Sequence, residues 1–350
     1  MRGQYNKPEA ARPQERPLTP STTPDQPAPR RHKLMSIQYT RAVAALAVVV
    51  WHTGWARTAL GQSGVDAFFV VSGFVMMLVS GRENSPPRFG LLRITRIVPL
   101  YWAVTAVAAW LDKPSPSDLL ASLFFWPDHE FPVVIQGWSL NLEMSYYLLF
   151  ALSLLAPGRW RVAVLAAEMV ALCIVLPALF TLGVPLAAWS SPLAFEFLAG
   201  AVLFLLWQRE WLPVGWAAWV MFAAGVIVLA ASHLLGGAPA GWTRLAFWGV
   251  PAFAIVAGGL GIEAAGQLPR SRLLGTLGEA SYAIYLTHFI ALGVVAGLLH
   301  QLWAPLAVVL VIAWACLIGW LVHRGFELPM HRASKMAIAL VWRRRQPRTA

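Results

Sequence analysis

Residues 35–55 read MSIQYTRAVAALAVVVWHTGW, an apolar run that contains two ionisable side chains, Arg41 and His52. About 20 mostly apolar residues are enough to cross a bilayer as a helix. Eleven helical residues turn the chain through about 1100°, so Arg41 and His52 lie on one face, about 16 Å apart along the axis. Ionisable groups within a membrane are costly unless they line a protein cavity, and they usually mark a function. The stretch therefore predicts a transmembrane helix that carries a site.

The composition predicts a membrane location for most of the chain. Hydrophobic residues make up 58% of the 350 residues and charged residues 12%, whereas about a quarter of a soluble domain is charged. The two cysteines, Cys173 and Cys316, both lie in apolar stretches and form neither a spaced framework nor a metal-ligand pattern. We interpret both as small core residues and expect no metal.

Apolar runs separated by polar breaks predict an all-α fold, a single polytopic bundle of about ten transmembrane helices over residues 34–330. The sequence shows no internal repeat and no second, soluble domain. A short apolar piece at 118–126 is too brief to cross, so we expect it to lie along the surface or to re-enter. The predicted spans are 35–55, 64–80, 95–111, 138–156, 160–180, 191–207, 214–235, 243–262, 277–299 and 304–324.

The distribution of basic residues between these spans predicts the orientation. Successive loops lie on opposite sides of the membrane, and the two resulting sets of loops differ sharply in their content of basic residues. In membrane proteins the cytoplasmic loops carry the excess of Lys and Arg. The set that we assign to the cytoplasm holds Arg82, Arg88, Arg93, Arg96, Arg159, Arg161, Arg209, Arg270 and Arg272. The opposite set holds Arg57 and Lys113, with Arg244 at a helix edge. Both termini are therefore predicted to be cytoplasmic, in a multi-pass protein of the cytoplasmic (inner or plasma) membrane.

The net charge of +11 is concentrated in two flanks of the bundle. Residues 1–33 are rich in Pro, Gln and Arg and lack apolar periodicity, so they predict a disordered cytoplasmic tail. Residues 331–350 predict a second basic cytoplasmic tail. Basic segments beside membrane helices contact anionic lipids, so this charge indicates membrane lipids as partners rather than nucleic acid.

The predicted orientation sorts the polar residues of the spans by depth. His52 lies near the outer end of the first span, and Asp66 lies at a similar depth because the second span begins outside. Glu143 lies in the outer half of the fourth span. We predict that these three side chains converge on one cavity in the outer half of the bundle, because unpaired charges in lipid are costly.

A second, basic layer is predicted at the cytoplasmic side. Arg93 and Arg96 are three residues apart at the start of the third span, on one helical face and near the depth of Arg41. We predict that these arginines converge on the cytoplasmic mouth of the outer cavity, with a continuous channel between the two layers.

Each of these residues also has a structural interpretation. Arg93 and Arg96 fit topology markers, and His52 fits a hydrogen-bonded histidine of the core. Asp66, close to the outer interface, fits a cap at the start of its helix. Glu143 lies deeper, where a purely structural role is less favoured.

Five motifs, in order, resemble those of the membrane acyltransferase-3 family over about residues 35 to 330. They are Arg41-x10-His52, Gly64 to Phe74, Arg93 to Trp102, Trp138 to Tyr147 (with Ser145 where an aromatic residue is common) and Leu277 to His288. The segments Gln38-Tyr39-Thr40-Arg41 and Val98-Pro99-Leu100-Tyr101-Trp102 most resemble the exopolysaccharide O-acetyltransferase branch, which includes the succinoglycan type. The ordered set is far more specific than any one motif.

The resemblance implies transfer of an acyl group, most often acetyl from cytoplasmic acetyl-CoA, to a carbohydrate hydroxyl. Arg41, Arg93 and Arg96 would then bind the CoA phosphates, because guanidinium groups match phosphate oxygens. His52 would act as the general base or transiently accept the acyl group, and Glu143 or Asp66 would orient its ring. The substrate-binding residues implied by the motifs are Trp138, Ser139, Tyr282 and His288.

The sequence leaves the acceptor and the partners open. An exopolysaccharide repeat, a lipid-linked oligosaccharide, a peptidoglycan sugar and a glycosylated small molecule all fit, with polysaccharide-assembly proteins as further candidate partners. A transporter or flippase for a lipid-linked sugar also fits a cationic inner layer and an acidic outer layer. That alternative predicts discontinuous helices and an internal repeat, and the sequence shows no repeat.

Overall fold

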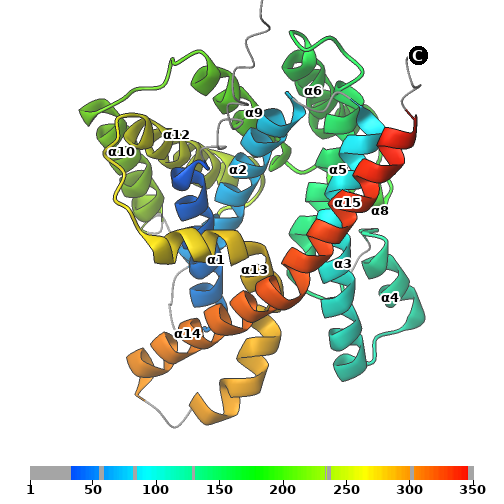
Figure 1. The fold of residues 1–350 in the computed structure, drawn as a ribbon, viewed down its shortest axis with the longest axis vertical. Coiled ribbons are helices and arrows are strands. Elements are labelled where there is room, and N and C mark those ends of the chain that lie inside the picture. Colours follow the sequence, from blue (N-terminus) through cyan, green and yellow to red (C-terminus); the bar gives the residue numbers. More distant parts are fainter. Residues whose placement is uncertain are drawn as a thin grey trace, which may run out of the picture. The chain divides into compact units, whose positions relative to one another are not determined.

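The computed structural model describes residues 33–54, 59–81, 85–127, 131–232, 234, 238–299 and 303–345. These residues form helices without any strand, which confirms the predicted all-α class (Figure 1). The predicted tail at 1–33 lies outside the described residues except for Lys33. The elements are α1 (Met35–His52), η1 (Ala59–Gln62), α2 (Ser63–Ser80), α3 (Pro86–Asp112), α4 (Pro116–Leu123), α5 (Gly137–Ser153), α6 (Arg161–Val170), η2 (Ala171–Val175), α7 (Leu176–Leu179), α8 (Val184–Trp189), α9 (Ala194–Gln208), α10 (Trp216–Ser232), α11 (Gly241–Arg244), η4 (Leu245–Gly249), α12 (Val250–Ala264), α13 (Arg272–Leu299), α14 (Ala304–Val322), η5 (His323–Glu327) and α15 (Leu328–Arg345).

Six helical stretches in the described part of the chain are long and apolar enough to cross a membrane. This agrees with the composition and supports a membrane protein. The total of ten spans and the cytoplasmic position of both termini remain predictions. The six stretches are Ala59–Ser80, Pro86–Asp112, Arg161–Leu179, Leu186–Gln208, Gly241–Ala264 and Pro305–Trp342.

The apolar piece predicted at 118–126 forms most of α4, a helix of eight residues that packs on α3. Ser115 caps its start by accepting a hydrogen bond from the backbone of Asp118. Tyr101 and Trp102 of α3 bond to Ser122 and to the carbonyl of Leu123 at 2.8 and 2.9 Å. The segment therefore lies along a longer helix instead of crossing the bundle.

Helix α1, which carries Arg41 and His52, packs against α2, α12 and α13. Two glycines allow the close approach. A Cβ on Gly64 of α2 would overlap the carbonyl oxygen of Ala44, and one on Gly278 of α13 would overlap that of Gln38. Because α1 is uninterrupted from Met35 to His52, the two ionisable residues keep the helical spacing expected from the sequence.

The start of α1 is capped from another helix. Leu34 at the N-cap position offers no side-chain acceptor. Glu263 of α12 instead accepts hydrogen bonds from the backbone N–H groups of Met35 and Ser36 at 2.7 and 2.9 Å. A carboxylate at this end satisfies free N–H groups and complements the helix dipole, so α12 fixes the position of α1 along its axis.

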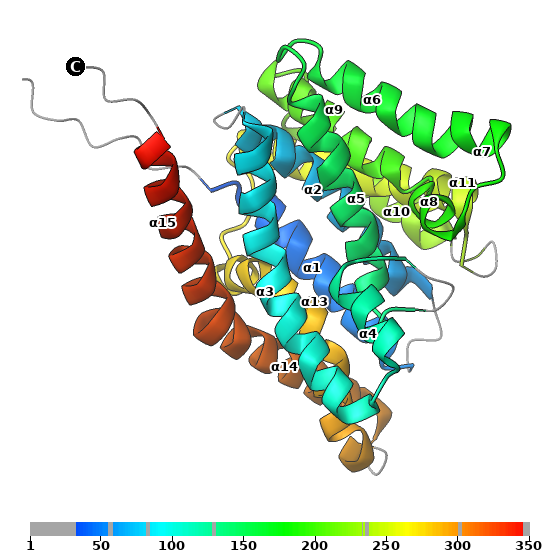
Figure 2. The same ribbon diagram turned by 90° about the vertical axis from the view of Figure 1, so that its right-hand side faces the viewer.

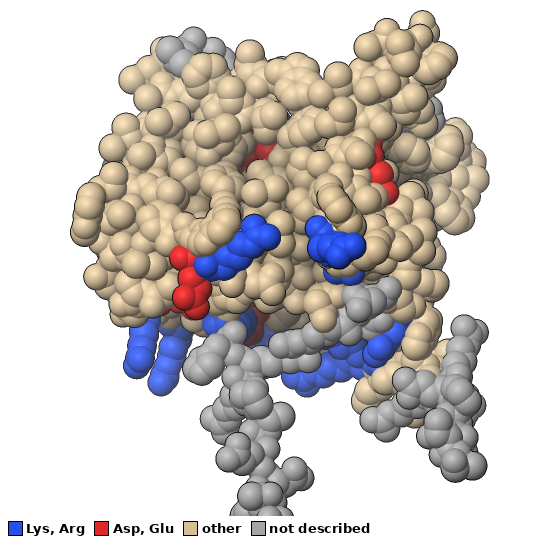
Figure 3. Space-filling model, turned by 90° about the horizontal axis from the view of Figure 1, so that it is seen from above, with Lys and Arg blue, Asp and Glu red and all other residues tan. Residues whose placement is uncertain are grey.

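The chain continues from α14 through the π-helical turn η5 into α15, which packs against α3 (Figure 2). The segment predicted as a basic tail from residue 331 therefore continues as a helix to Arg345. Figure 3 looks onto the end of the bundle where α15 finishes, and Lys and Arg side chains gather along one side of this face. This is the face that the sequence assigns to the cytoplasm.

Candidate active site

The three predicted arginines line one cavity of about 90 Å³ among α1, α2, α3, α5 and α13, here called the arginine cavity. This agrees with the prediction that Arg41, Arg93 and Arg96 converge. Its polar lining residues are Arg41, Ser72, Arg93, Arg96, Ser139, Glu143, Tyr147, Tyr282 and Tyr285. Helix α1 contributes Arg41 alone, and the other four helices each contribute residues three or four positions apart, because such residues share a helical face.

The guanidinium groups in this cavity are available to a ligand. Among the described residues, none of the three arginines forms a salt bridge. Arg93 is only 8% exposed, and its buried Nε has no hydrogen-bond partner. Its nearest aromatic neighbour is Phe89, whose ring centre lies 5.6 Å from Cζ. Among the described lining residues, three guanidinium groups share the cavity with a single carboxylate, that of Glu143, so its lining is net positive and favours an anion.

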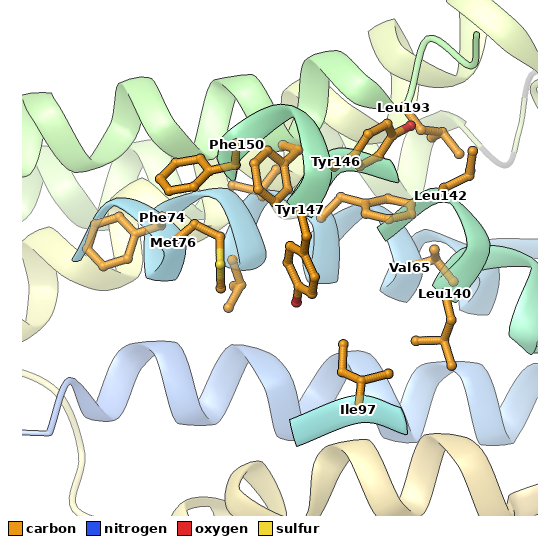
Figure 4. Close-up of a cluster of buried hydrophobic side chains, with 14 of the residues drawn as sticks. Val65, Phe74, Met76, Ile97, Leu140, Leu142, Tyr146, Tyr147, Phe150 and Leu193 are labelled. Carbon is orange, nitrogen blue, oxygen red and sulfur yellow. The ribbon is translucent and has the colours of Figure 1, made fainter. Parts of the chain in front are cut away.

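Glu143 lies in the arginine cavity and not beside His52. Its Oε1 accepts hydrogen bonds from Ser72 Oγ, at 2.8 Å, and from the hydroxyl of Tyr147 one turn further along α5. Figure 4 shows Tyr147 pointing from α5 into the space bordered by Val65, Leu140 and Ile97. Two hydroxyl donors thus hold this carboxylate in place among the arginines.

His52 lines a second cavity of about 420 Å³, here called the histidine cavity. It lies between the end of α1, the start of α2, the segment before α5 and helix α13. Its lining residues are Val48, Trp51, His52, Gln62, Val65, Phe131, Ile135, Gln136, Trp138 and Tyr285.

The hydrogen bonds of His52 fix its neutral tautomer. His288 Nδ1 lies 2.6 Å from the carbonyl oxygen of Tyr285, so it must carry the proton and leave Nε2 as an acceptor. That Nε2 lies 3.1 Å from His52 Nδ1, which is also 2.9 Å from the carbonyl oxygen of Val48. Because both neighbours of His52 Nδ1, the carbonyl oxygen of Val48 and Nε2 of His288, are acceptors, the proton of the neutral His52 ring lies on Nδ1. Its Nε2 then has a free lone pair, as a general base requires.

The two cavities share two lining residues, Val65 of α2 and Tyr285 of α13. The hydroxyl of Tyr285 lies 2.7 Å from Ser139 Oγ, which lines the arginine cavity. It also donates to the carbonyl oxygen of Gln136, at 3.1 Å, on the side of the histidine cavity. Val65 and Tyr285 therefore lie where the two cavities meet, and the predicted continuous channel would pass between them.

Asp66 lines neither cavity and is fully buried. Its carboxylate forms a two-point ion pair with Arg244 of α11, at 3.0 Å to Nε and 2.8 Å to Nη2. The guanidinium stacks near the rings of Trp138 and Trp248, at 5.8 and 5.0 Å. The expectation that His52, Asp66 and Glu143 share one cavity was wrong, because Asp66 pairs with Arg244 and Glu143 accepts hydrogen bonds from Ser72 and Tyr147 in the arginine cavity.

The predicted substrate-binding residues divide between the two cavities. Trp138 lines the histidine cavity, whereas Ser139 and Tyr282 line the arginine cavity. Tyr282 donates to the carbonyl oxygen of Ile97 at 2.9 Å, which joins α13 to α3. His288 is fully buried and contacts His52 directly.

Sequence reasoning missed Arg244, Tyr147 and Tyr285. An unpaired Asp66 within a membrane demands a cation, and Arg244 is the basic residue at a helix edge on the same predicted side. Tyr147 follows Glu143 by four residues and therefore shares its helical face. No local signal identifies Tyr285, because its place between the cavities depends on how α13 packs against α2 and α5.

Comparison with known proteins identifies the family. Residues 35–324 match the family described as "Acyltransferase domain", type 3. The chain belongs to the acyltransferase-3 family. The exopolysaccharide production protein ExoZ of Rhizobium meliloti (strain 1021) is 36% identical over 298 residues, which cover 79% of this chain and 91% of ExoZ. No solved structure matches the chain significantly.

Two further relatives have names that specify acyl transfer. Acyltransferase MdmB of Streptomyces mycarofaciens is 28% identical over 327 residues, and the match covers 75% of this chain and 80% of MdmB. Peptidoglycan O-acetyltransferase OatA of Listeria monocytogenes serovar 1/2a (strain ATCC BAA-679 / EGD-e) is 26% identical over 158 residues, 37% of this chain and 25% of OatA. Together with the family match, they identify this acyltransferase-3 protein as an O-acyltransferase.

Proposed function

We propose that this enzyme transfers an acetyl group from cytoplasmic acetyl-CoA to a hydroxyl of an exopolysaccharide or of its lipid-linked precursor. The observation that carries the proposal is the adjacency of two chemically different cavities. One presents unpaired arginines, and the other presents a histidine with a free ring nitrogen, with Val65 and Tyr285 between them.

The arginine cavity supports an acyl-CoA donor. CoA carries several phosphate charges, and guanidinium groups bind phosphate oxygens through paired N–H donors. Arg93 and Arg96 lie in the first half of α3, at the end of this helix that the charge distribution assigns to the cytoplasm. The nucleotide would remain at this end, while the slender pantetheine arm carries the thioester toward His52.

The histidine cavity supports the acceptor and the transfer step. The acceptor hydroxyl gives its proton to Nε2 of His52 as its oxygen attacks the thioester carbonyl carbon. The carbon–sulfur bond then breaks, and the CoA sulfur takes the proton from the imidazolium. The ester and free CoA are the products. His288 and the carbonyl of Val48 keep the other ring nitrogen protonated throughout.

The larger volume of the histidine cavity suits a sugar, and the name of ExoZ favours an exopolysaccharide among the four acceptor classes. We place the enzyme in the cytoplasmic membrane with both termini in the cytoplasm, in contact with membrane lipids and with polysaccharide-assembly proteins. Roles of Glu143 and Asp66 in orienting His52 are less well supported, because neither carboxylate reaches it.

The decisive experiment combines purified protein with cell-surface glycans. Protein in lipid nanodiscs is incubated with acetyl-CoA and exopolysaccharide oligosaccharides, and released CoA is measured with a thiol reagent. Mass spectrometry then compares glycans from cells with and without the gene. We expect acceptor-dependent CoA release and an acetyl-sized mass difference, both absent with His52→Ala. A glycan of unchanged mass and a wild-type protein that releases no CoA would contradict the proposal.

A further inference from the structure

Among the described lining residues, Val65 and Tyr285 are the two that the arginine and histidine cavities have in common. Both side chains are almost entirely buried, at 6% exposure. Resting on the acyl-CoA function proposed above, we propose that these two side chains form a constriction through which the acyl end of the donor reaches His52, and that its width restricts the enzyme to short acyl groups.

Hydrogen bonds hold the Tyr285 side of the constriction in place. Its hydroxyl contacts Ser139 and Gln136 at the start of α5, at 2.7 and 3.1 Å. Gln136 in turn donates to the carbonyl oxygen of Leu286 at 2.7 Å, so α5 and α13 are linked twice at this level. The ring of Phe68 packs edge-on against Tyr285 at 5.8 Å. Contacts with residues that line each of the two cavities therefore hold the ring of Tyr285 in place.

The chemistry of the donor explains why this position controls selectivity. The polyanionic nucleotide stays with the arginines, so only the uncharged thioester end can extend toward His52. The acyl chain must then pass between the aliphatic side chain of Val65 and the aromatic ring of Tyr285, so the space between them limits its size. One methylene in an apolar pocket changes the specificity constant by about 10-fold to 200-fold. A butyryl group has two more methylenes than acetyl.

The constriction can be tested by changing its width from either side. Tyr285→Ala widens it and keeps the backbone carbonyl that holds His288 at 2.6 Å. We expect this variant to raise kcat/KM for butyryl-CoA relative to acetyl-CoA by about tenfold or more. Tyr285→Phe keeps the ring, so the ratio should stay near that of the wild type. Val65→Phe narrows the passage and should lower acetyl transfer.

Val309→Ala is the matched control, because this aliphatic residue of α14 is 61% exposed and lies outside both cavities. An unchanged butyryl-to-acetyl ratio in a folded Tyr285→Ala protein that binds CoA would overturn the inference. If that variant does not fold, Val65→Ala widens the opposite wall and must raise the ratio. A wild-type protein that neither binds CoA nor releases it from acetyl-CoA refutes the acyl-CoA function itself, before any variant is compared.

Discussion

Nε2 of His288 lies 3.1 Å from Nδ1 of His52, and this contact orients the imidazole that we propose as the general base. Because His288 donates its own Nδ1 proton to the carbonyl of Tyr285, it can only accept at Nε2. His288 is fully buried and does not line the histidine cavity. In the proposed mechanism His288 is therefore a positioning residue, which acts on the substrate through His52.

Replacing His288 tests this role. His288→Phe keeps an aromatic side chain but removes the acceptor, so His52 can more easily adopt the tautomer with a protonated Nε2. We expect kcat to fall by about ten- to a hundredfold, within the contribution of general-base catalysis, with little change in KM for acetyl-CoA. His288→Gln restores an acceptor and should recover part of kcat. A merely structural role would instead lower thermal stability equally in both variants and give no recovery.

His52 itself should be indispensable for transfer. His52→Ala removes the base but leaves the arginine cavity intact, since His52 does not line that cavity. We expect transfer to fall by at least about 10²-fold to 10⁴-fold, while CoA affinity measured by calorimetry is unchanged. Substantial transfer by a well-expressed His52→Ala protein would exclude its assignment as the base.

The arginines should control donor binding. Arg93→Ala and Arg96→Ala each remove a guanidinium group that we propose to bind phosphate. Arg41→Lys replaces a planar guanidinium, which has paired N–H donors, by a compact ammonium group. We expect weaker CoA binding in all three and a further loss in added salt, because salt screens charge–phosphate attraction. Arg270→Ala is the control, since this exposed arginine lies outside the cavity. Equal CoA affinity in all four variants would leave the arginines as topology markers.

The sequence was sufficient to predict helices and the arginine cavity, for a clear physical reason. Helical periodicity determines which residues of one helix share a face, so Arg41 and His52, or Arg93 and Arg96, could be grouped from spacing alone. The position of a residue along the axis of its helix likewise follows from the helical rise of about 1.5 Å per residue. These are local properties, and the structure agrees with the helical spacing: α1 is uninterrupted, and Arg93 and Arg96 line one cavity.

Contacts between helices could not be predicted in the same way. Depth placed Asp66 and Glu143 near His52, but it carries no information on which direction each side chain faces. In the structure Asp66 turns toward Arg244, and Glu143 toward Ser72 and Tyr147. The cap that Glu263 provides to α1 joins residues more than 220 positions apart, and no local pattern marks such a pair.

The ion pair of Asp66 and Arg244 should stabilise the bundle. Removal of one partner leaves a buried charge without compensation, which costs about 3–5 kcal/mol. We expect Asp66→Ala and Arg244→Ala each to lower thermal stability strongly, and the double variant to lose less than the sum of the two. Thermal unfolding in detergent, read in a double-mutant cycle, measures this coupling. A stable Asp66→Ala protein that has lost only its transfer activity would favour a catalytic role for Asp66.

The close packing of α13 against α1 should also be required, because it sets the distance between His288 and His52. In Gly278→Ala the new Cβ would overlap the carbonyl oxygen of Gln38, a backbone atom that cannot move without shifting α1. We expect a loss of about 1–3 kcal/mol in the free energy of unfolding, as for other overpacked interfaces, together with reduced transfer. Gly293→Ala on the same helix is the matched control, since nothing lies within 4 Å of its Cβ position. There the better helix propensity of alanine should leave stability unchanged or raise it by up to about 1 kcal/mol. Equal thermal stability and equal activity in the two variants would show that α1 and α13 are not in backbone contact at Gly278.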